Sequence, residues 1–270
     1  MYLRKSVEKV KKMPNIAKQS NLSENLPERE EAGWTKVANR EIKCVDLEEK
    51  KAVENHCVCI LPDAEELDFY KILRAQIQHR CKKNGWNTIM ITSALPGEGK
   101  TLTSVNLALT FAKELTHPVL LVDCDLRRQN IHQYLGFSSD KGVIDNLADD
   151  FPLDDLIIWP GIEKLHVISG GRTVHDSTEM LSSHKMKAAI VEMKKRYKDR
   201  YVFFDAPPIL SAADAIAFSP LVDCILIVVQ AASTSIRDVK KAVEMIPKDK
   251  FLGFVLNRQR SPIKGYYKYH

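Results

Sequence analysis

Residues 88–112 read TIMITSALPGEGKTLTSVNLALTFA, and this stretch decides the fold. Its first five residues predict a buried strand, and residues 102–112 predict a helix. Between them lies a glycine-containing turn that ends in Gly99-Lys100-Thr101. A strand, such a turn and a helix form the context of a phosphate-binding loop. We therefore expect backbone N–H groups of the turn, together with the N-terminus of the helix, to bind phosphate.

The side chains of this turn fit the same chemistry. The Lys100 ammonium can neutralise β- and γ-phosphates, and the Thr101 hydroxyl can bind Mg²⁺. The strict pattern G-x-x-x-x-G-K-S/T places a glycine where this chain has Ala94, so the motif is imperfect. The nucleotide-binding residues that we expect from the loop are Pro96, Gly97, Glu98, Gly99, Lys100, Thr101 and Leu102.

Further apolar runs along the chain predict a series of buried strands. The expected strands are 118–123, 165–168, 201–205, 223–229 and 251–256, and the expected helices are 63–83, 185–198 and 236–246. Strands that alternate with helices indicate an α/β fold with a doubly wound, mostly parallel sheet. The fold class that we predict is thus a P-loop α/β domain.

Three aspartates follow the predicted strands at the ends where ligands bind. Asp123 and Asp125 follow the strand 118–123, and Asp205 ends the strand 201–205. Ligands of such sheets bind outside the carboxyl ends of the strands, so these acids should meet the phosphate-binding loop in one crevice. A carboxylate there can hold Mg²⁺ beside Thr101, and a second one can accept a proton from an incoming hydroxyl group.

The chain ends differ from this central region. We expect a polar, flexible N-terminal extension over residues 1–60, a nucleotide-binding domain over 61–258 and a tyrosine-containing tail over 259–270. The segment His56–Cys59 is interpreted as a partly buried strand rather than a zinc site, since it has no second ligand pair. No run of eighteen apolar residues predicts a membrane-spanning helix, and the cysteine spacing is typical of a reduced, cytoplasmic protein.

Three motifs together resemble the bacterial tyrosine kinases (BY-kinases), the autokinases of capsule and exopolysaccharide production. Residues 91–101, ITSALPGEGKT, are similar to the Walker A motif of that family. Residues 119–128, VLLVDCDLRR, resemble its Walker A′ motif, and residues 202–208, VFFDAPP, resemble its Walker B motif. The resemblance covers roughly residues 64–257, and a tyrosine cluster follows it.

The resemblance implies a role for each matching residue. Lys100, Asp123 and Asp125 would be the catalytic residues, with Asp123 as the base for a tyrosine hydroxyl. Thr101, Asp125 and Asp205 would organise Mg²⁺, and Asn257 would lie near the adenine of ATP. Tyr266, Tyr267 and Tyr269 would be the phospho-acceptors, because family members phosphorylate a C-terminal tyrosine cluster between subunits.

The resemblance also implies partners. The family assembles through an E-x-x-R-x-x-R element, for which this chain has Asp68, Lys71 and Arg74, and lysine lacks the bidentate fork of arginine. We expect a homo-oligomer, with subunit number left open. A membrane-embedded activator, or polysaccharide co-polymerase, on a separate chain would place the protein in the cytoplasm at the periphery of the inner membrane.

Two other functions stay open at this point. A ParA/MinD-like partitioning ATPase would carry a signature lysine early in the loop, where this chain has Leu95 followed by Pro96. A non-catalytic, nucleotide-gated regulator of polysaccharide assembly would bind nucleotide without turning it over. A sequence-specific nucleic-acid binder is not expected, because no basic helix-turn-helix or aromatic platform is present.

Overall fold

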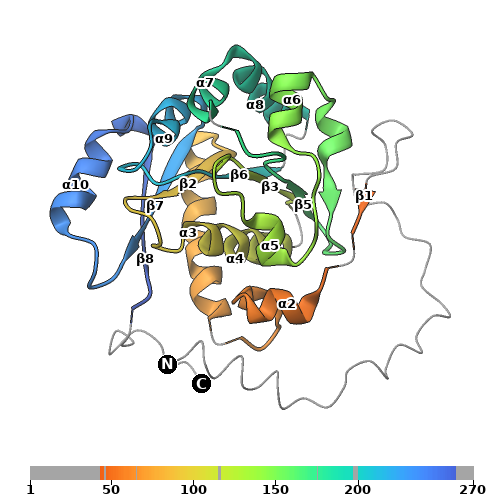
Figure 1. Ribbon diagram of the computed structural model, residues 1–270. Helices are drawn as coiled ribbons and strands as arrows, with labels where there is room; N and C mark the ends of the chain where they lie inside the picture. Colours follow the sequence, from red (N-terminus) through yellow and green to blue (C-terminus); the bar gives the residue numbers. More distant parts are fainter. Residues whose placement is uncertain are drawn as a thin grey trace.

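The computed structural model describes residues 43–45, 47–64, 66–114, 117–174, 176–196 and 200–259. These residues form an eight-stranded sheet with helices on both faces (Figure 1). The strand order is β1-β4-β5-β3-β6-β2-β7-β8. Only β4 and β5 pair antiparallel among the described strands, and the other neighbours are parallel. The α/β fold class predicted from the sequence is therefore confirmed.

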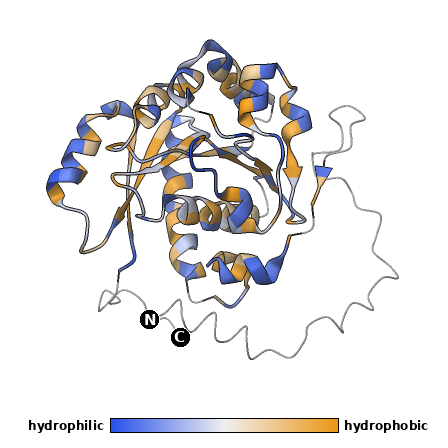
Figure 2. Cartoon of the chain, in the orientation of Figure 1, coloured by the Kyte–Doolittle hydropathy of each residue, from blue (hydrophilic) through white to orange (hydrophobic). Residues whose placement is uncertain are grey.

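The strands are short and largely buried, which explains their apolar sequences (Figure 2). Their bounds are β1 Lys43–Cys44, β2 Thr88–Ser93, β3 Val119–Asp123, β4 Ile158–Trp159, β5 Leu165–Ile168, β6 Tyr201–Asp205, β7 Cys224–Gln230 and β8 Phe251–Asn257. All residues of β2, β3, β5 and β6 are buried. Strands that are covered on both faces need no alternation of polar and apolar residues.

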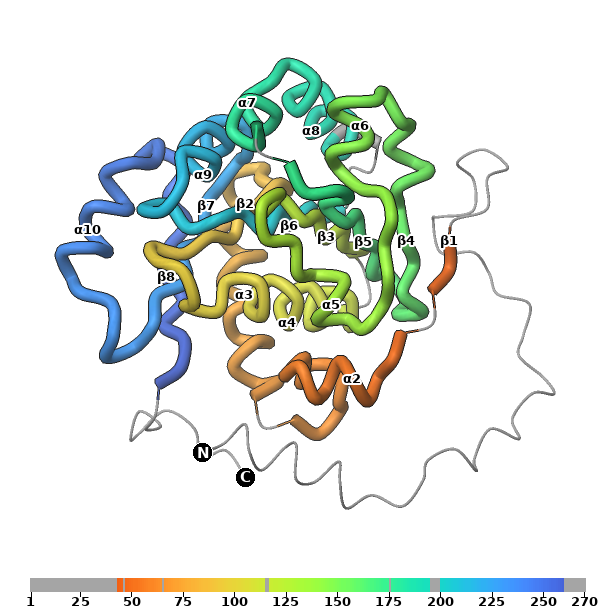
Figure 3. The backbone as a smooth tube through the Cα atoms, viewed as in Figure 1, coloured from red at the N-terminus to blue at the C-terminus, as the bar shows by residue number. Residues whose placement is uncertain are grey.

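Helices enclose each face of the sheet around its own apolar cluster (Figure 3). One face carries α2 (Glu49–Glu54), α3 (Leu67–Asn84), α4 (Lys100–Ala112) and α5 (Ile131–Leu135). The other face carries α6 (Val143–Asp149), α7 (Ser177–Ser182), α8 (His184–Arg196), α9 (Ala213–Phe218) and α10 (Ile236–Glu244). Short 3₁₀ helices join them: η2 (Val58–Ile60), η3 (Leu153–Leu156), η4 (Ser219–Leu221) and η5 (Lys248–Lys250).

The structure differs from the sequence-based expectation at the N-terminal side. Part of the expected extension 1–60 packs on the domain, because Ala52, Val53 and Cys57 are buried. The segment expected as a strand contains the 3₁₀ helix η2 instead, and its Cys59 N–H donates to Asn106 Oδ1 of α4 at 3.0 Å. The helix expected from Asp63 begins at Leu67. The apolar residues of α2 and η2 are buried because they pack against α5 and α4. The local composition of the segment does not reveal these distant contacts.

The register of the central strands determines where the site lies. Strand β6 lies between β3 and β2, and Asp205 of β6 is the partner of Asp123 in β3 and of Ile91 in β2. The carboxyl ends of β3 and β6 are therefore level with each other, and β2 continues for two residues beyond them. Strand β2 leads directly into the glycine-containing turn, so that turn and both acids share one edge of the sheet.

Candidate nucleotide site

The turn between β2 and α4 uses two glycines in the left-handed region of backbone conformation. Gly97 has φ of 81° and Gly99 has φ of 93°. A Cβ at Gly99 would also lie 2.2 Å from Asn257 Nδ2, so that position has no room for a side chain. The Asn257 amide in turn donates to the Glu98 carbonyl oxygen at 2.8 Å. These contacts join the loop to the end of β8, while Pro96 and Gly97 of the same loop are exposed.

The Glu98 side chain is buried and anchors the loop to β7. It is 2% exposed. Its Oε2 accepts from the Leu95 N–H at 2.6 Å, and its Oε1 accepts from the Gln230 N–H at 3.1 Å and from the Thr234 hydroxyl. Glu98 was expected among the nucleotide-binding residues, and its carboxylate is fully engaged within the protein. Its contribution to phosphate binding would come from the backbone.

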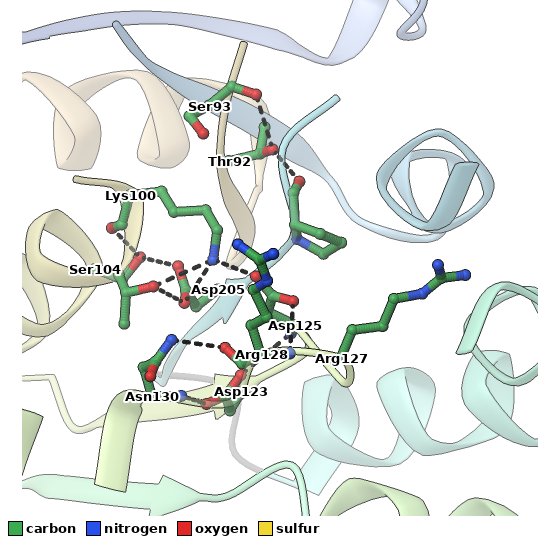
Figure 4. A network of polar contacts seen from close by, with 12 residues as sticks. Thr92, Ser93, Lys100, Ser104, Asp123, Asp125, Arg127, Arg128, Asn130 and Asp205 are labelled. Carbon is green, nitrogen blue, oxygen red and sulfur yellow. Dashed lines mark hydrogen bonds and ion pairs between the residues drawn. The ribbon is translucent and has the colours of Figure 1, made fainter. Parts of the chain in front are cut away.

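Lys100 lies at the start of α4 and reaches into the cluster of acids (Figure 4). Its Nζ is 2.8 Å from Asp125 Oδ2 and 3.3 Å from Asp205 Oδ2. Burial alone would lower the pKa of Lys100, but Asp205 and Asp125 outweigh burial and raise the pKa above its usual value. Lys100 is therefore a fixed positive charge at the carboxyl edge of the sheet.

Asp205 is the hub of the polar contacts. Its Oδ2 accepts from the Thr101 hydroxyl at 2.6 Å, and its Oδ1 accepts from the Ser104 hydroxyl at 3.0 Å. Burial raises the pKa of Asp205, while Lys100 and the two hydroxyl groups act in the opposite direction. Thr101, Ser104 and Asp205 thus fix one another, which brings the expected metal residues Thr101 and Asp205 into direct contact.

Asp123 organises the loop that follows β3. Its Oδ1 accepts from the Asp125 N–H at 3.1 Å, and its Oδ2 accepts from the Asn130 and Ile131 N–H groups at 3.0 and 3.1 Å. The side chain is completely buried. Burial, followed by repulsion from Asp205, raises the pKa of Asp123 to about 7. These contacts turn the loop back so that Asp125 faces Lys100.

The donor set of this cluster fits a small divalent cation. Among the buried groups, the carboxylates of Asp123, Asp125 and Asp205 face the single ammonium of Lys100, which leaves negative charge in excess when all are ionised. Carboxylate and hydroxyl oxygens are the ligands that Mg²⁺ prefers. Within the described residues no three His, Cys, Asp or Glu side chains form a metal-binding group. A bound Mg²⁺ would therefore depend on phosphate oxygens and water for most of its ligands, as at other nucleotide sites.

Sequence reasoning missed the residues that hold the Walker A′ loop in place. Arg127 points away from Lys100 (Figure 4) and binds helices α7 and α9. Its Nε is 2.7 Å from Ser177 Oγ and 3.3 Å from Asp214 Oδ2. Asp214 is completely buried and also accepts from the hydroxyl groups of Ser177 and Thr178. The only signal in the sequence is the opposite charge of Arg127 and Asp214, and nothing in their spacing connects the two residues.

Two groups of expected residues lie elsewhere. Leu102 is half-buried against the cluster on the α3–α4 face and packs there. Of the assembly element, Lys71 pairs with Asp68 at 2.9 Å, and Arg74 Nη1 donates to the Thr110 carbonyl of α4 at 2.6 Å. These groups therefore have partners within their own chain. The expected phospho-acceptors Tyr266, Tyr267 and Tyr269 lie outside the described residues.

Comparison with known proteins identifies the family. Residues 86–251 match the family model described as an AAA domain. The chain is 30% identical over 211 residues to the tyrosine-protein kinase YwqD of Bacillus subtilis, an alignment that covers 77% of this chain and 88% of that protein. The chain belongs to the bacterial tyrosine kinases. The predicted family and the predicted enzyme class, protein-tyrosine kinase, are thereby confirmed.

Other relatives of the BY-kinase agree with this assignment. The putative tyrosine-protein kinase CapB of Staphylococcus aureus is 27% identical, with 74% of this chain and 88% of CapB covered. The putative tyrosine-protein kinase EpsB of Ralstonia solanacearum is 27% identical over 69% of this chain. EpsB is a longer protein, and the alignment covers 24% of its length. Among solved structures, the kinase domain of Escherichia coli tyrosine kinase ETK superposes with a TM-score of 0.71 at 25% identity, covering 79% of this chain and 84% of that chain.

The partitioning-type ATPases are also similar in fold. The septum site-determining protein MinD of Pyrococcus horikoshii, solved with Mg-ADP, gives a TM-score of 0.54 at 25% identity and covers 64% of this chain and 71% of that chain. The P-loop fold is thus shared by both groups. Across the residues that the structure describes, no helix is both long and apolar enough to cross a membrane.

Proposed function

We propose that this BY-kinase transfers the γ-phosphoryl group of Mg·ATP to tyrosine residues in the C-terminal segment of a neighbouring copy, with Tyr266, Tyr267 and Tyr269 as acceptors. The observation that carries the proposal is that Lys100 and Thr101, which follow β2, meet the acids at the ends of the neighbouring strands β3 and β6. Phosphoryl transfer needs little covalent chemistry from the protein, so position and charge account for most of the catalysis.

Each residue has a proposed role in this reaction. Lys100 would hold the β- and γ-phosphates, together with the backbone N–H groups of residues 96–102. Thr101, Asp125 and Asp205 would hold Mg²⁺, which when bound neutralises the charge that develops on the phosphoryl oxygens. Asn257 lies against the backbone of Gly99 and Glu98, and an adenine beside it would lie next to the loop.

The base that accepts the tyrosine proton would be Asp123. Support comes from the direction in which burial and then Asp205 shift the pKa of Asp123, because a raised pKa lies nearer the operating pH at which a general base works best. Its complete burial and its three backbone donors favour a role in positioning instead. The neighbouring acid Asp125 is also buried, with 5% of its surface exposed, and its proposed role is to hold Mg²⁺. The pH–rate profile of Asp123→Asn distinguishes the two roles: a lost acidic limb supports a base, and an unchanged profile with a lower kcat supports a positioning residue.

The cellular setting follows from the family resemblance. The protein would act in the cytoplasm as a homo-oligomer, at the inner membrane through a separate, membrane-embedded activator or polysaccharide co-polymerase. Its reaction would regulate capsule or exopolysaccharide synthesis or export. The absence of a suitable membrane-crossing helix among the described residues is compatible with a separate activator.

Mass spectrometry of the full chain after incubation with ATP and Mg²⁺ tests the proposal. We expect phosphate on Tyr266, Tyr267 or Tyr269, with a gain when membranes that contain the activator are added. Lys100→Met should abolish the modification, and Glu54→Gln, an exposed change in α2, should leave it unchanged. ATP hydrolysis without phosphotyrosine would favour a partitioning-type ATPase. Nucleotide binding without either activity would favour the gated regulator.

A further inference from the structure

An apolar groove lies between α10 and β8, two elements that are neighbours at one side of the molecule (Figure 3). Its apolar walls are Ile236, Val239 and Val243 of α10 and Phe251 and Phe254 of β8, and its volume is about 390 Å³. We call this feature the α10–β8 groove. It lies on the face of the sheet opposite α3 and α4, and it takes no part in the nucleotide site described above.

The groove opens onto exposed apolar side chains. Ile236 is 77% exposed, Phe254 is 47% exposed and Leu256 is 58% exposed. Phe254 and Leu256 are two residues apart in one strand, so their side chains point to the same side of the sheet. Strand β8 is also an edge strand, with no neighbour beyond it in the described sheet. Contiguous exposed apolar surface beside an open strand edge usually marks a binding surface.

The end of β8 places one segment of the chain beside this groove. The described chain ends at Gln259, two residues after the last residue of β8. Arg258 has φ of 58°, in the left-handed region, so the strand direction is broken immediately after Asn257. Residues 260–270 follow, and Ile263, Tyr266, Tyr267 and Tyr269 are their large apolar or aromatic residues.

Length and tethering favour this segment over other occupants. Eleven residues span at most about 36–40 Å, whereas Phe254 lies three residues before Asn257, or roughly 10 Å along the strand. A segment tethered at this distance has an effective concentration in the millimolar range, which a second copy does not reach in dilute solution. Tyrosine also suits a groove that is half open to water, because its ring is apolar and its hydroxyl tip is polar.

We propose that residues 260–270 dock in the α10–β8 groove of their own chain, with the tyrosine rings against Ile236, Phe251 and Phe254. Docking within one chain keeps the tyrosines on the outer edge strand and away from Lys100. If the kinase function proposed above holds, the charge of about −1.5 to −2 on a phosphotyrosine opposes burial of its ring between the apolar walls. The charged residues Lys240 and Glu244 also line the groove, so phosphorylation shifts the modified side chain out of the apolar part of the groove. Docking itself does not depend on that function.

Photocrosslinking of the full chain tests the docking without ATP. Tyr267 is replaced by p-benzoylphenylalanine, and equal amounts of ¹⁴N- and ¹⁵N-labelled protein are mixed at low micromolar concentration and irradiated. Trypsin then releases residues 251–258, FLGFVLNR, as a peptide that contains Phe251 and Phe254. We expect crosslinks from the tail to this peptide or to α10, with both halves carrying the same isotope.

Groove substitutions provide the second arm. Ile236→Ser alters a side chain that is 77% exposed, so the fold should persist, and the crosslink yield should fall at least about fivefold. Val191→Ser, at a 40% exposed position of α8, is the matched control and should retain the yield. Crosslinks that join the two isotopes would show that the groove takes the tail of another copy and would overturn the proposal. Crosslinks elsewhere, or a yield unchanged by Ile236→Ser, would also overturn it.

Discussion

The buried carboxylate of Glu98 gives the most direct test of how the nucleotide loop is held. Its two oxygens accept from the Leu95 and Gln230 N–H groups and from the Thr234 hydroxyl. Glu98→Gln keeps the shape of the side chain but replaces one oxygen by an NH₂ group. The glutamine amide can place its NH₂ group towards Leu95 or towards Gln230. In either case the NH₂ group faces a backbone N–H, so the hydrogen bond to Leu95 or the one to Gln230 is lost.

The magnitude follows from the contacts. A hydrogen bond to a charged group contributes about 1.5–3 kcal/mol, and a buried donor left unsatisfied costs about 1–3 kcal/mol. Removal of the buried charge offsets part of this loss, because a carboxylate is costly to desolvate. We therefore expect Glu98→Gln to lower the free energy of unfolding by about 1–3 kcal/mol. ATP binding should also weaken, because the Leu95 end of the anchor belongs to the phosphate-binding loop.

Urea unfolding followed by tryptophan fluorescence measures the first effect, and isothermal titration calorimetry with Mg·ATP measures the second. Glu54→Gln makes the same chemical change at an exposed position of α2 and should alter neither quantity. A Glu98→Gln protein with the unfolding free energy and the ATP affinity of the unchanged chain would refute the view that Glu98 anchors the loop.

Three further predictions concern other parts of the structure. Gly99→Ala introduces a Cβ 2.2 Å from Asn257 Nδ2 at a φ of 93°, so calorimetry should show ATP affinity weakened about tenfold or more. The double variant with Asn257→Ala should still bind ATP more weakly than Asn257→Ala alone, because the backbone strain at position 99 persists. Asp214→Asn weakens the contact that holds Arg127, and urea unfolding should show a loss of about 1–3 kcal/mol. Burial, and then Arg200, lowers the pKa of His166 to about 3. Between that pKa and the usual value of about 6.5, the unfolded chain binds a proton that the folded chain does not, so the unfolding free energy should fall by a few kcal/mol as the pH drops through this range. His166→Gln should reduce this pH dependence.

Each of these predictions has an outcome that contradicts it. A double variant that binds ATP as tightly as Asn257→Ala alone would mean that backbone strain at Gly99 contributes nothing. An Asp214→Asn protein as stable as the parent chain would show that Arg127 does not depend on that charge. If the pH dependence of unfolding is the same with and without His166, this side chain does not account for the acid sensitivity.

The core of the site was predictable from the sequence because strand ends carry a strong local signal. Each acid follows a continuous apolar run, and parallel strands place their carboxyl ends at one edge of the sheet. Lys100, Thr101, Asp125 and Asp205 therefore meet as expected. The order of β3, β6 and β2 was not predictable in this way, since all three strands are buried and their sequences do not specify which strands are neighbours.

Contacts between distant segments escaped sequence reasoning. Glu98 binds Gln230, 132 residues away, and no spacing or pattern connects the two. The pairing of Arg127 with Asp214 spans 87 residues and depends on how α7 and α9 pack. Residues 49–60 were assigned to an extension because the segment 1–60 as a whole is polar, yet burial of apolar side chains such as Ala52 and Cys57 is enough to attach them to the domain.

The position of Asn257 has a practical consequence for anyone who handles this protein. The same residue ends the last strand, contacts the backbone of Gly99 and Glu98, and stands two residues before the final described residue. A load applied to the C-terminus, by a purification tag, a surface tether or a fused reporter, reaches the nucleotide loop directly through the Asn257 amide and also through β7, which pairs with β8 and contacts Glu98. Attachment at the N-terminus spares that amide, and immobilised binding assays should use that end.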